Sequence, residues 1–459
     1  MADDAASWPL LPAERTWSAF RLLVVLTVTA AAPWFFIIGG AIGYYLDFPM
    51  GTAAMLAGGL IGMGIVTLAV VPVSTRYAID SVAAAVAQFG TRGIVLVVIP
   101  QYLSILGWNA TLLVFFGKNI EQLAELAGLS AATGTSLVPL ATTLVCLICF
   151  PILRFGAAGI ERVCQTLVVL ILAVGIWLIW LLVGEQQAAI EAARPAGASG
   201  DLWWDYITGT EILIAANLSW WSYLGAMARQ VPKASAAVLP SMLGLGLTVP
   251  LLSLIGLASM LALGQTDPSD WLVTFGGPVH GAIALGFVAI SNFGTVLAGT
   301  YAAALGLKQA PGLERLSLNA LILLSLVPLL VLSTVLADMV AARFTTFLAF
   351  IGLVFGPICG IQIADYLLLR RQRLSLAALF ERGPEARYRF WGGYNPAAIL
   401  AMATGCLTYL LLLDPLSYVS RWPYEWTTAS LPAVLVSGGL YWLVTRFWVR
   451  PAGKGGYSD

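Results

Sequence analysis

Apolar residues form a series of runs, each about twenty residues long, separated by short polar segments along most of the chain. A run of this length is what an α-helix needs to cross the hydrocarbon core of a bilayer. We therefore predict about twelve membrane-spanning helices, near 21–46, 52–73, 93–117, 136–153, 163–184, 206–226, 238–264, 280–306, 316–337, 343–369, 396–413 and 428–448. The segment 74–93, between the second and third spans, is predicted to form a short amphipathic helix that ends at Gly90.

Two of these spans are interrupted near their middle. The first contains Pro33, which cannot donate a backbone hydrogen bond. The sixth contains Asn217 and Ser219, whose side chains compete with helical hydrogen bonding. Each span begins a group of five, and matching interruptions are typical of transporters built from inverted repeats. Two unrelated kinked helices are the alternative. We therefore expect discontinuous helices 1 and 6, with a binding site between the breaks.

The order of the spans predicts an all-α polytopic membrane protein with a five-plus-five inverted-repeat core. Residues 1–20 are expected to form a cytoplasmic tail, 21–184 the first repeat and 185–375 the second. The remainder, 376–459, holds a cytoplasmic loop, two additional helices and a short tail. Hydrophobic residues make up 59% of the chain and charged residues only 10%, whereas soluble domains average roughly 25% charged. This composition excludes a soluble protein.

Basic residues predict the orientation, because cytoplasmic segments of membrane proteins are enriched in lysine and arginine. With both termini in the cytoplasm, the basic residues left outside are Lys118, Arg194, Arg343 and Arg421. The densest basic cluster, between Arg370 and Arg389, then marks one cytoplasmic loop. Asp365, just before it, is either a buried acid or the ion-pair partner of Arg370. We expect a multi-pass protein of a bacterial inner membrane, and zero net charge gives no reason to propose a nucleic-acid partner.

Residues suited to membrane-embedded catalysis or to a metal centre are scarce. The single histidine, His280, cannot build a metal cluster, and the five cysteines all lie in apolar runs. No glycine-rich stretch is followed by the lysine and hydroxyl residue of a phosphate-binding loop. We therefore expect neither an enzyme nor a resident cofactor. A channel and a membrane enzyme are the alternatives from other functional classes.

Glu211 is the one acidic residue that we place well inside a span. A carboxylate at this depth costs several kcal/mol unless it is paired, hydrated or protonated, so it is a functional candidate. Tryptophan can stack on a flat heterocycle, and amide side chains can bond its polar edge, although both also serve helix packing. The predicted substrate site is Trp34, Trp108, Asn109, Glu211, Asn217, Trp220 and Asn292.

The eighth span is rich in small and polar residues, including Ser291 and Thr295 one helical turn apart. Such residues allow close helix packing. Alternatively, their hydroxyls bind a cation together with backbone carbonyls freed at the break near Ala32. The predicted cation site is therefore Ala32, Ser291 and Thr295. Because burial favours the neutral form of a carboxyl group, Glu211 is also a candidate proton carrier. Na⁺ and H⁺ both remain open as the coupling ion.

Five segments carry a resemblance to a known family. They are RYAIDSVAAAVAQFGTRG after the second span, GWNA in the third, LSWWSYLGAMAR in the sixth, TYAAALGL in the eighth and FLAFIGLVFGPICGIQIADYLLLRR in the tenth. They resemble the nucleobase–cation symporter family, the permeases for cytosine, purines, uracil, allantoin, hydantoins and thiamine precursors. The segment EILIAANLSW looks like the branch that includes cytosine and hydroxymethylpyrimidine permeases.

This resemblance implies import of a cytosine-like heterocycle by cation symport with alternating access. Permeases for hydroxymethylpyrimidine, allantoin or hydantoin are the alternative. The resemblance further implies that Trp108 stacks on the ring and that Thr295 is a sodium ligand, with Glu211 and Asn217 in the span-six part of the site. The chain departs from the family at Val296, where relatives have a second hydroxyl. The partners implied are a small heterocycle, a cation and the lipid bilayer; the oligomeric state stays open.

Overall fold

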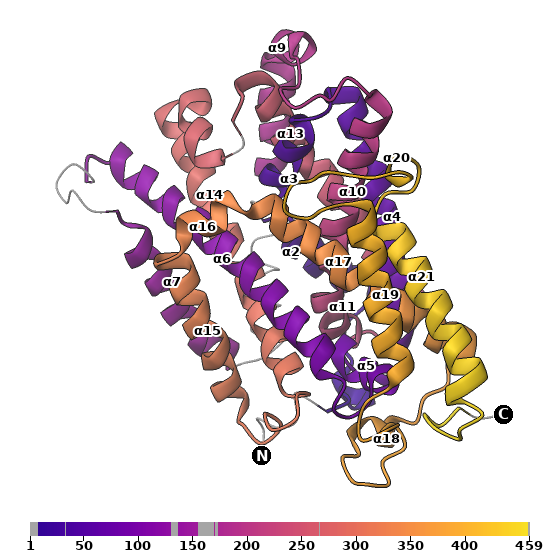
Figure 1. The fold of residues 1–459 in the computed structure, drawn as a ribbon. Coiled ribbons are helices and arrows are strands. Elements are labelled where there is room, and N and C mark those ends of the chain that lie inside the picture. Colours follow the sequence, from indigo (N-terminus) through magenta and orange to yellow (C-terminus); the bar gives the residue numbers. More distant parts are fainter. Residues whose placement is uncertain are drawn as a thin grey trace.

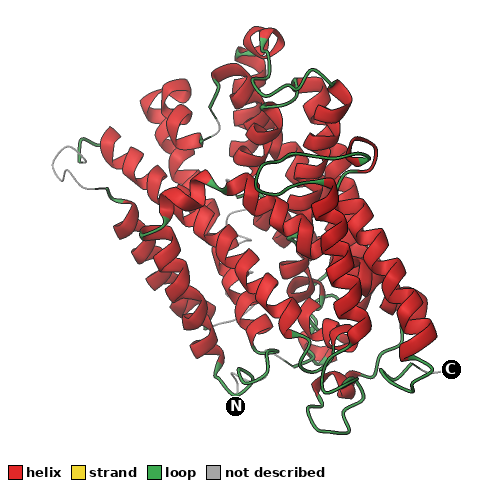
Figure 2. Cartoon of the chain, viewed as in Figure 1, coloured by secondary structure: helices red, strands yellow, loops and turns green. Residues whose placement is uncertain are grey.

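The computed structural model describes residues 8–32, 34–129, 136–154, 169, 173–265 and 267–457. Regular structure in these ranges is helical, and the only β-pairing within them is two isolated bridges (Figures 1 and 2). The predicted all-α fold is confirmed. Pro33, which we expected to break the first span, lies outside the described residues.

The helices follow the predicted spans closely. In the first group they are α2 (Ala19–Ala30), α3 (Trp34–Gly43), α4 (Phe48–Tyr77), α6 (Val95–Leu126) and α7 (Val138–Leu153). In the second they are α10 (Leu202–Leu218), α11 (Trp221–Ala228), α12 (Val238–Ser241), η5 (Met242–Leu247), α13 (Thr248–Leu263), α14 (Pro268–Leu307), α15 (Leu318–Thr334), α17 (Phe344–Ile363) and η6 (Ala364–Leu369). The additional pair is α19 (Pro396–Leu412) and α21 (Ser430–Val444), the latter continued by η7 (Thr445–Val449). Of the predicted span 163–184, the structure describes residues 169 and 173–184; the apolar helix Ala173–Glu185 lies there and includes η3 (Trp180–Gly184).

Not every predicted span is a long, uninterrupted helix. Among the described residues, five helices are long and apolar enough to cross a membrane, and the bent pair α2–α3 makes a sixth. The helices α7, α15 and α19 are shorter, with 16 or 17 residues each. The sixth predicted span is divided between α10 and α11. The described residues therefore contain fewer long helices than predicted spans, because several spans are broken or short.

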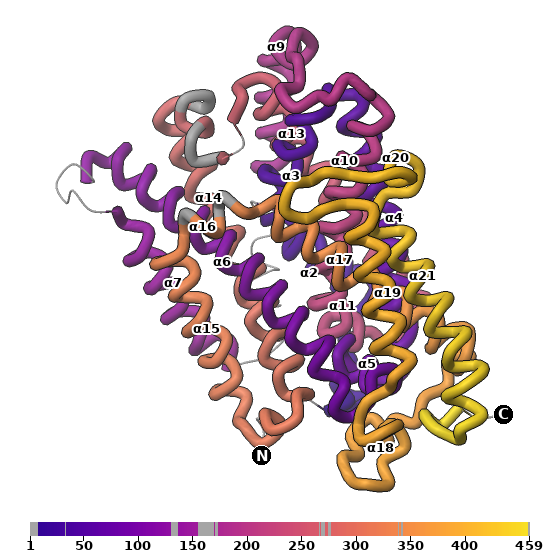
Figure 3. The backbone as a smooth tube through the Cα atoms, in the orientation of Figure 1, coloured from indigo at the N-terminus to yellow at the C-terminus, as the bar shows by residue number. Residues whose placement is uncertain are grey.

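Both predicted breaks are confirmed. The axes of α2 and α3 meet at 64°. Between α10 and α11 the amide of Trp220 donates to Asn217 O and that of Ser222 donates to Ser219 O, each at 3.0 Å. These are tighter, three-residue hydrogen bonds than those of an α-helix. Figure 3 shows the four half-helices near the middle of the bundle, where α3 also packs against α10.

The helix predicted within 74–93 is present as α5 (Ser81–Phe89) and ends at Gly90, whose φ is 93°. Its predicted amphipathic character is wrong, because all of its residues are buried. It packs against α11, α17 and α18 (Leu376–Phe380) at one end of the bundle (Figure 1). Elements from several parts of the chain cover it, so it has no exposed face.

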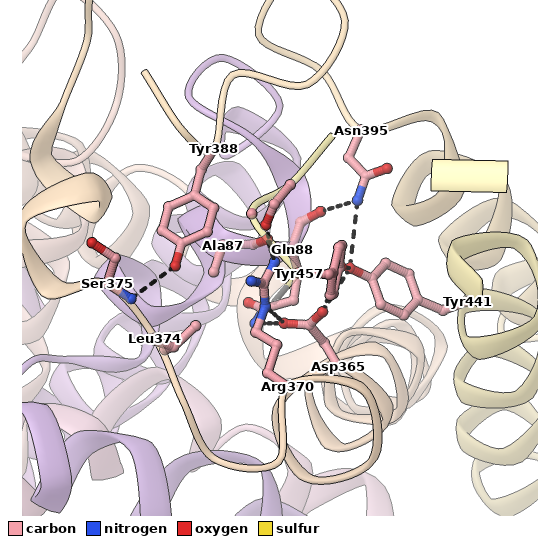
Figure 4. Close-up of polar contacts among 12 residues, drawn as sticks. Ala87, Gln88, Asp365, Arg370, Leu374, Ser375, Tyr388, Asn395, Tyr441 and Tyr457 are labelled. Carbon is pink, nitrogen blue, oxygen red and sulfur yellow. Dashed lines mark hydrogen bonds and ion pairs between the residues drawn. The ribbon is translucent and has the colours of Figure 1, made fainter. Parts of the chain in front are cut away.

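Asp365 anchors this end of the bundle (Figure 4). Its Oδ2 accepts hydrogen bonds from Arg370 Nε at 2.7 Å and Gln88 Nε2 at 2.6 Å. Its Oδ1 accepts from the hydroxyls of Tyr441 at 3.1 Å and Tyr457 at 2.7 Å. Asp365 is fully buried, so both sequence-based explanations hold together: it is a buried acid and an ion-pair partner. The network joins α5, η6, α21 and the C-terminal segment.

Glu211 is a second buried acid that joins separate segments of the chain, at the end of α21 opposite to Asp365. Its Oε2 accepts hydrogen bonds from the amides of Ala429 and Ser430, both at 3.1 Å, and its Oε1 accepts from Ser430 Oγ at 2.6 Å. These amides belong to the first turn of α21, where helical N–H groups lack intrahelical partners and the helix dipole favours negative charge. The buried carboxylate of α10 therefore caps α21 and attaches the additional helices to the core.

This contact predicts a stability effect. Replacing Glu211 by leucine leaves two buried amides and one hydroxyl without an acceptor, which should lower the free energy of unfolding by about 2–4 kcal/mol. Glu211→Gln retains a carbonyl acceptor and should lose less. The measurement is the thermal unfolding of the purified full chain in detergent.

The matched control is Glu125→Leu, since Glu125 is exposed at the end of α6. If Glu211→Leu and Glu125→Leu unfold at the same temperature as the wild type, the cap contributes nothing to stability.

Candidate functional site

A small cavity lies where the two broken helices meet. It is lined by Trp34, Trp108, Leu112, Ser219, Trp220, Tyr223 and Thr295. These residues come from α3, α6, α14, α11 and the link between α10 and α11. The empty space among these side chains, including the part open to its surroundings, is about 270 Å³.

Its walls are mainly aromatic. The ring centroids of Trp34 and Trp108 are 5.4 Å apart at an angle of 64°, and those of Trp34 and Trp220 are 6.0 Å apart at 59°. Tyr223 continues the wall, 5.4 Å from Trp220. Aromatic side chains offer flat apolar faces on which a heterocycle can stack. The structure thus brings together the three tryptophans predicted to bind substrate.

The indole of Trp108 is held in place by two phenylalanine rings. Its centroid lies 5.6 Å from that of Phe344 and 5.5 Å from that of Phe347, both edge-on and both in α17. Gly107, its neighbour, allows this packing, because a Cβ there would lie 2.5 Å from the Phe347 ring. The position of the Trp108 ring is therefore fixed by α17.

Two residues that line the cavity each have a buried polar atom without a hydrogen-bond partner among the described residues: Trp108 Nε1 and the Tyr223 hydroxyl. An indole N–H can only donate, whereas a phenol can donate or accept. Leaving a buried donor unpaired costs about 1–3 kcal/mol, and a carbonyl oxygen on a ligand would remove that cost. None of the lining residues carries a charge. The cavity therefore suits a neutral ring that bears carbonyl oxygens.

Thr295 joins the cavity to the broken end of helix 1. Its hydroxyl donates to Thr29 O, in the last turn of α2, at 3.1 Å. Ala32 O, just beyond α2, accepts from the amide of Phe35 at 3.2 Å. Ser291, one turn before Thr295, donates its hydroxyl to Val288 O within its own helix at 2.9 Å. Hydroxyl and carbonyl oxygens of this kind are the ligands that Na⁺ takes at broken helices.

Two of the predicted amide residues hold helices together beside the cavity rather than lining it. Asn217 Nδ2 donates to Gly59 O of α4 at 3.0 Å. Asn109 Nδ2 donates to Val296 O at 3.3 Å and to Thr300 Oγ1 at 3.2 Å, both in α14. Asn109 thereby holds α6 in place, which carries Trp108 of the cavity lining. Asn217 holds the end of α10, which precedes the link that lines the cavity.

Two other predicted substrate residues also lie outside the lining. Glu211 is engaged with α21, as described above, which explains its burial without a substrate. Asn292 is fully buried in α14, and both of its amide atoms lack partners among the described residues. The structure therefore brings together Trp34, Trp108 and Trp220 and separates Glu211 from them.

Three lining residues were not predicted: Leu112, Ser219 and Tyr223. Leu112 follows Trp108 by four positions and Tyr223 follows Trp220 by three, so each shares a helix face with a predicted tryptophan. This spacing from a predicted tryptophan could have identified Leu112 and Tyr223 in the sequence. A leucine or a serine in a membrane helix carries no comparable signal by itself.

Groups of histidine, cysteine and acidic residues that could hold a metal ion do not occur in the described part of the chain. The residues that line the cavity supply aromatic faces and hydroxyl groups.

Known structures share this fold. Mhp1, a nucleobase-cation-symport-1 family transporter solved closed with bromovinylhydantoin bound, matches with a TM-score of 0.81, at 19% identity over 97% of this chain and 96% of that one. Its inward-facing conformation gives 0.78 at 18% identity. A Na⁺-coupled sialic acid symporter in a substrate-bound outward-open state gives 0.62 at 12% identity, covering 94% and 91%. At these identities the likeness shows the fold: an inverted-repeat transporter core with discontinuous helices.

Sequence relatives match over shorter stretches. The purine-uracil permease NCS1 of Arabidopsis thaliana is 29% identical over 96 residues, which is 20% of this chain and 16% of that protein. The allantoin permease of Bacillus subtilis is 38% identical over 65 residues, or 14% and 13%. The matched segments thus span less than a fifth of either relative.

The match to a family is much longer. Residues 9–431 match the permeases for cytosine/purines, uracil, thiamine and allantoin. The match covers most of the chain and confirms the resemblance found in the sequence, and the relatives are permeases rather than enzymes. The chain therefore belongs to the family of membrane permeases for cytosine/purines, uracil, thiamine and allantoin.

Proposed function

We propose that the protein imports a nucleobase or a related pyrimidine-like heterocycle by cation symport with alternating access. The observation that carries this proposal is the cavity of Trp34, Trp108 and Trp220 at the junction of two broken helices. Binding sites of inverted-repeat transporters lie at such breaks. A flat ring that stacks on an indole face buries apolar surface.

The polar atoms of the cavity favour ring carbonyls. The family resemblance implied a cytosine-like substrate with Glu211 in its binding site, but that carboxylate is bound to α21. The donor Trp108 Nε1 instead suits an acceptor on the ring. Cytosine, uracil, hydantoins and allantoin all carry such a carbonyl, and hydroxymethylpyrimidine does not. We therefore propose the carbonyl-bearing rings as the substrate class.

We propose Na⁺ as the coupling ion. Thr295 Oγ1 and Thr29 O form an oxygen pair between α14 and the broken end of α2, and the carbonyl of Ala32 lies just beyond it in the chain. Ser291 remains a proposed fourth ligand. A proton is the alternative, but its predicted carrier, Glu211, is occupied as a helix cap.

Orientation follows from the basic residues. Arg370, Arg371 and Arg373 follow the end of α17, on the side that carries α5 and α18 (Figure 1). Because cytoplasmic segments are enriched in basic residues, we propose that this side faces the cytoplasm of a bacterial cell. Both chain termini then belong to the cytoplasmic side of the inner membrane.

The proposed function is tested by counterflow in proteoliposomes. Vesicles preloaded with unlabelled ring compound should accumulate labelled compound only if the protein is a carrier, since a channel or an enzyme does not exchange substrate in this way. Cytosine, uracil, hypoxanthine, allantoin, hydantoins and hydroxymethylpyrimidine are compared with and without Na⁺. Absence of exchange for every ring compound would contradict the proposal.

Trp108→Ala tests the aromatic wall. Stacking of one base on an aromatic side chain contributes about 1–3 kcal/mol, so we expect roughly tenfold to hundredfold weaker binding of the transported ring. The measurement is substrate affinity in detergent by fluorescence or calorimetry. Trp203→Ala is the control, because Trp203 is exposed and does not line the cavity. Equal affinity in both variants would remove Trp108 from the site.

Thr295→Val tests the cation site, since valine keeps the shape of threonine and removes only the hydroxyl. We expect the Na⁺ concentration for half-maximal uptake to rise at least about tenfold, because hydrogen bonds or ligation to charged groups contribute about 1.5–3 kcal/mol. Ser325→Ala is the control: this buried hydroxyl donates to Leu321 O within α15. Unchanged Na⁺ dependence in Thr295→Val would favour proton coupling.

A further inference from the structure

A second hollow lies far from the aromatic cavity, between the ends of α17 and α21. It is lined by Leu368, Leu369, Arg370, Arg371, Arg373, Trp442, Arg446 and Arg450, with about 770 Å³ of empty space. The arginines come from two regions separated by about seventy residues in sequence, and no lining residue is acidic. Clustering positive groups around an open space needs an explanation, because their mutual repulsion is unfavourable.

Both helices end in the same unusual way at this hollow. The amide of Arg370 donates to Asp365 O at 2.8 Å, and that of Arg450 donates to Thr445 O at 2.9 Å. Each is a five-residue hydrogen bond, wider than an α-helical turn, and such turns occur frequently at functional sites. The widened turns set the direction in which the arginines leave each helix.

The chain then turns sharply after η6. Arg371 and Gln372 have φ values of 49° and 64°, in the left-handed region that non-glycine residues seldom adopt. The turn is held by hydrogen bonds from the amide of Gln372 to Tyr366 O and from the amide of Leu374 to the Tyr77 hydroxyl, both at 2.7 Å. It keeps Arg371 and Arg373 beside Arg370 at the hollow.

Only part of the positive charge of the arginines at the hollow is balanced by acidic groups of the protein. Arg370 is paired with Asp365, and its guanidinium lies 4.1 Å from the ring centroid of Tyr457 (Figure 4). In the described part of the chain, Arg371, Arg373 and Arg446 have no carboxylate partner, and all three are exposed. A guanidinium group matches the geometry of phosphate oxygens with two parallel hydrogen bonds.

The surroundings of the hollow favour a lipid as the source of that phosphate. Leu368 in its wall is 60% exposed, and Phe447, next to Arg446, is 68% exposed. Leu443, near the end of α21, and Phe447, in η7, are both exposed. Arginines beside apolar side chains that face the bilayer match a molecule with an anionic head and hydrocarbon chains, and basic pockets between membrane helices bind such headgroups.

We propose that this hollow, hereafter the arginine pocket, binds the phosphate of an anionic phospholipid headgroup at the membrane surface. The guanidinium groups of Arg371, Arg373 and Arg446 contact the phosphate, while the acyl chains lie along Leu368 and α21. The site does not involve the transported ring or its coupling ion, so it stands independently of the proposed transport function. Occupation would hold the end of α17 against the end of α21.

The test compares lipid binding by the full chain and by Arg373→Gln/Arg446→Gln. Purified protein in detergent is titrated with phosphatidylglycerol or with phosphatidylcholine, and bound lipid is counted by native mass spectrometry while thermal unfolding is followed in parallel. We expect the wild type to retain phosphatidylglycerol and to be stabilised by it. The double variant should bind it at least roughly tenfold more weakly.

The control variant, Lys233→Gln/Arg315→Gln, removes the same charge from exposed positions outside the arginine pocket. It should bind phosphatidylglycerol as the wild type does. Equal binding by all three proteins, or no preference over phosphatidylcholine, overturns the proposal. Stabilisation by inorganic phosphate alone at the same concentration, lost in the Arg373→Gln/Arg446→Gln variant, would also overturn it by assigning the pocket to a free anion.

Discussion

A helix that stops inside a membrane leaves backbone groups that neither water nor the next turn can satisfy, and this constraint organises the centre of the molecule. Helix 1 and helix 6 both stop there. Thr295 of α14 donates its hydroxyl to Thr29 O at the first break, and Asn217 ties the second break to Gly59 O of α4. The polar residues around the cavity therefore both hold the broken backbone and supply the oxygen atoms from which a cation site can be built.

The two buried carboxylates also need hydrogen-bond partners within the protein. Glu211 takes two amides and a hydroxyl at the start of α21, and Asp365 takes four donors near its other end. A buried charge is tolerated when every oxygen is hydrogen-bonded. Because both acids are satisfied by the additional helices and their surroundings, neither contributes charge to the aromatic cavity. The cavity stays neutral, which suits a neutral ring.

The sequence predicted the features that depend on nearby residues. Asn217 and Ser219 marked the break in helix 6, and run lengths of apolar residues located the spans. It could not predict the role of Glu211, because the capping amides lie more than two hundred positions later in the chain. The arginine pocket shows the same limit: the basic loop after α17 was visible as a cluster, whereas Arg446 joins it only through packing of α21. Contacts between segments that are distant in sequence become visible only in the folded structure.

The contacts between the helices around the cavity differ in the free energy needed to break them. Pulling α21 from α10 would leave Glu211 without its hydrogen-bond donors, and pulling α21 from η6 would remove the Tyr441 hydroxyl from Asp365. Breaking a buried charged contact costs several kcal/mol. These elements should therefore move as one body. The walls formed by Trp34, Trp108 and Trp220 meet through ring contacts alone, with no hydrogen bond between them. A flat ring can replace these ring contacts with its own faces, and the hydrogen bond from Thr295 Oγ1 to Thr29 O at the break in helix 1 joins two uncharged groups, so it is weaker than the contacts of the two buried acids. The break in helix 1 is therefore easier to separate from α14 than α21 is from α10.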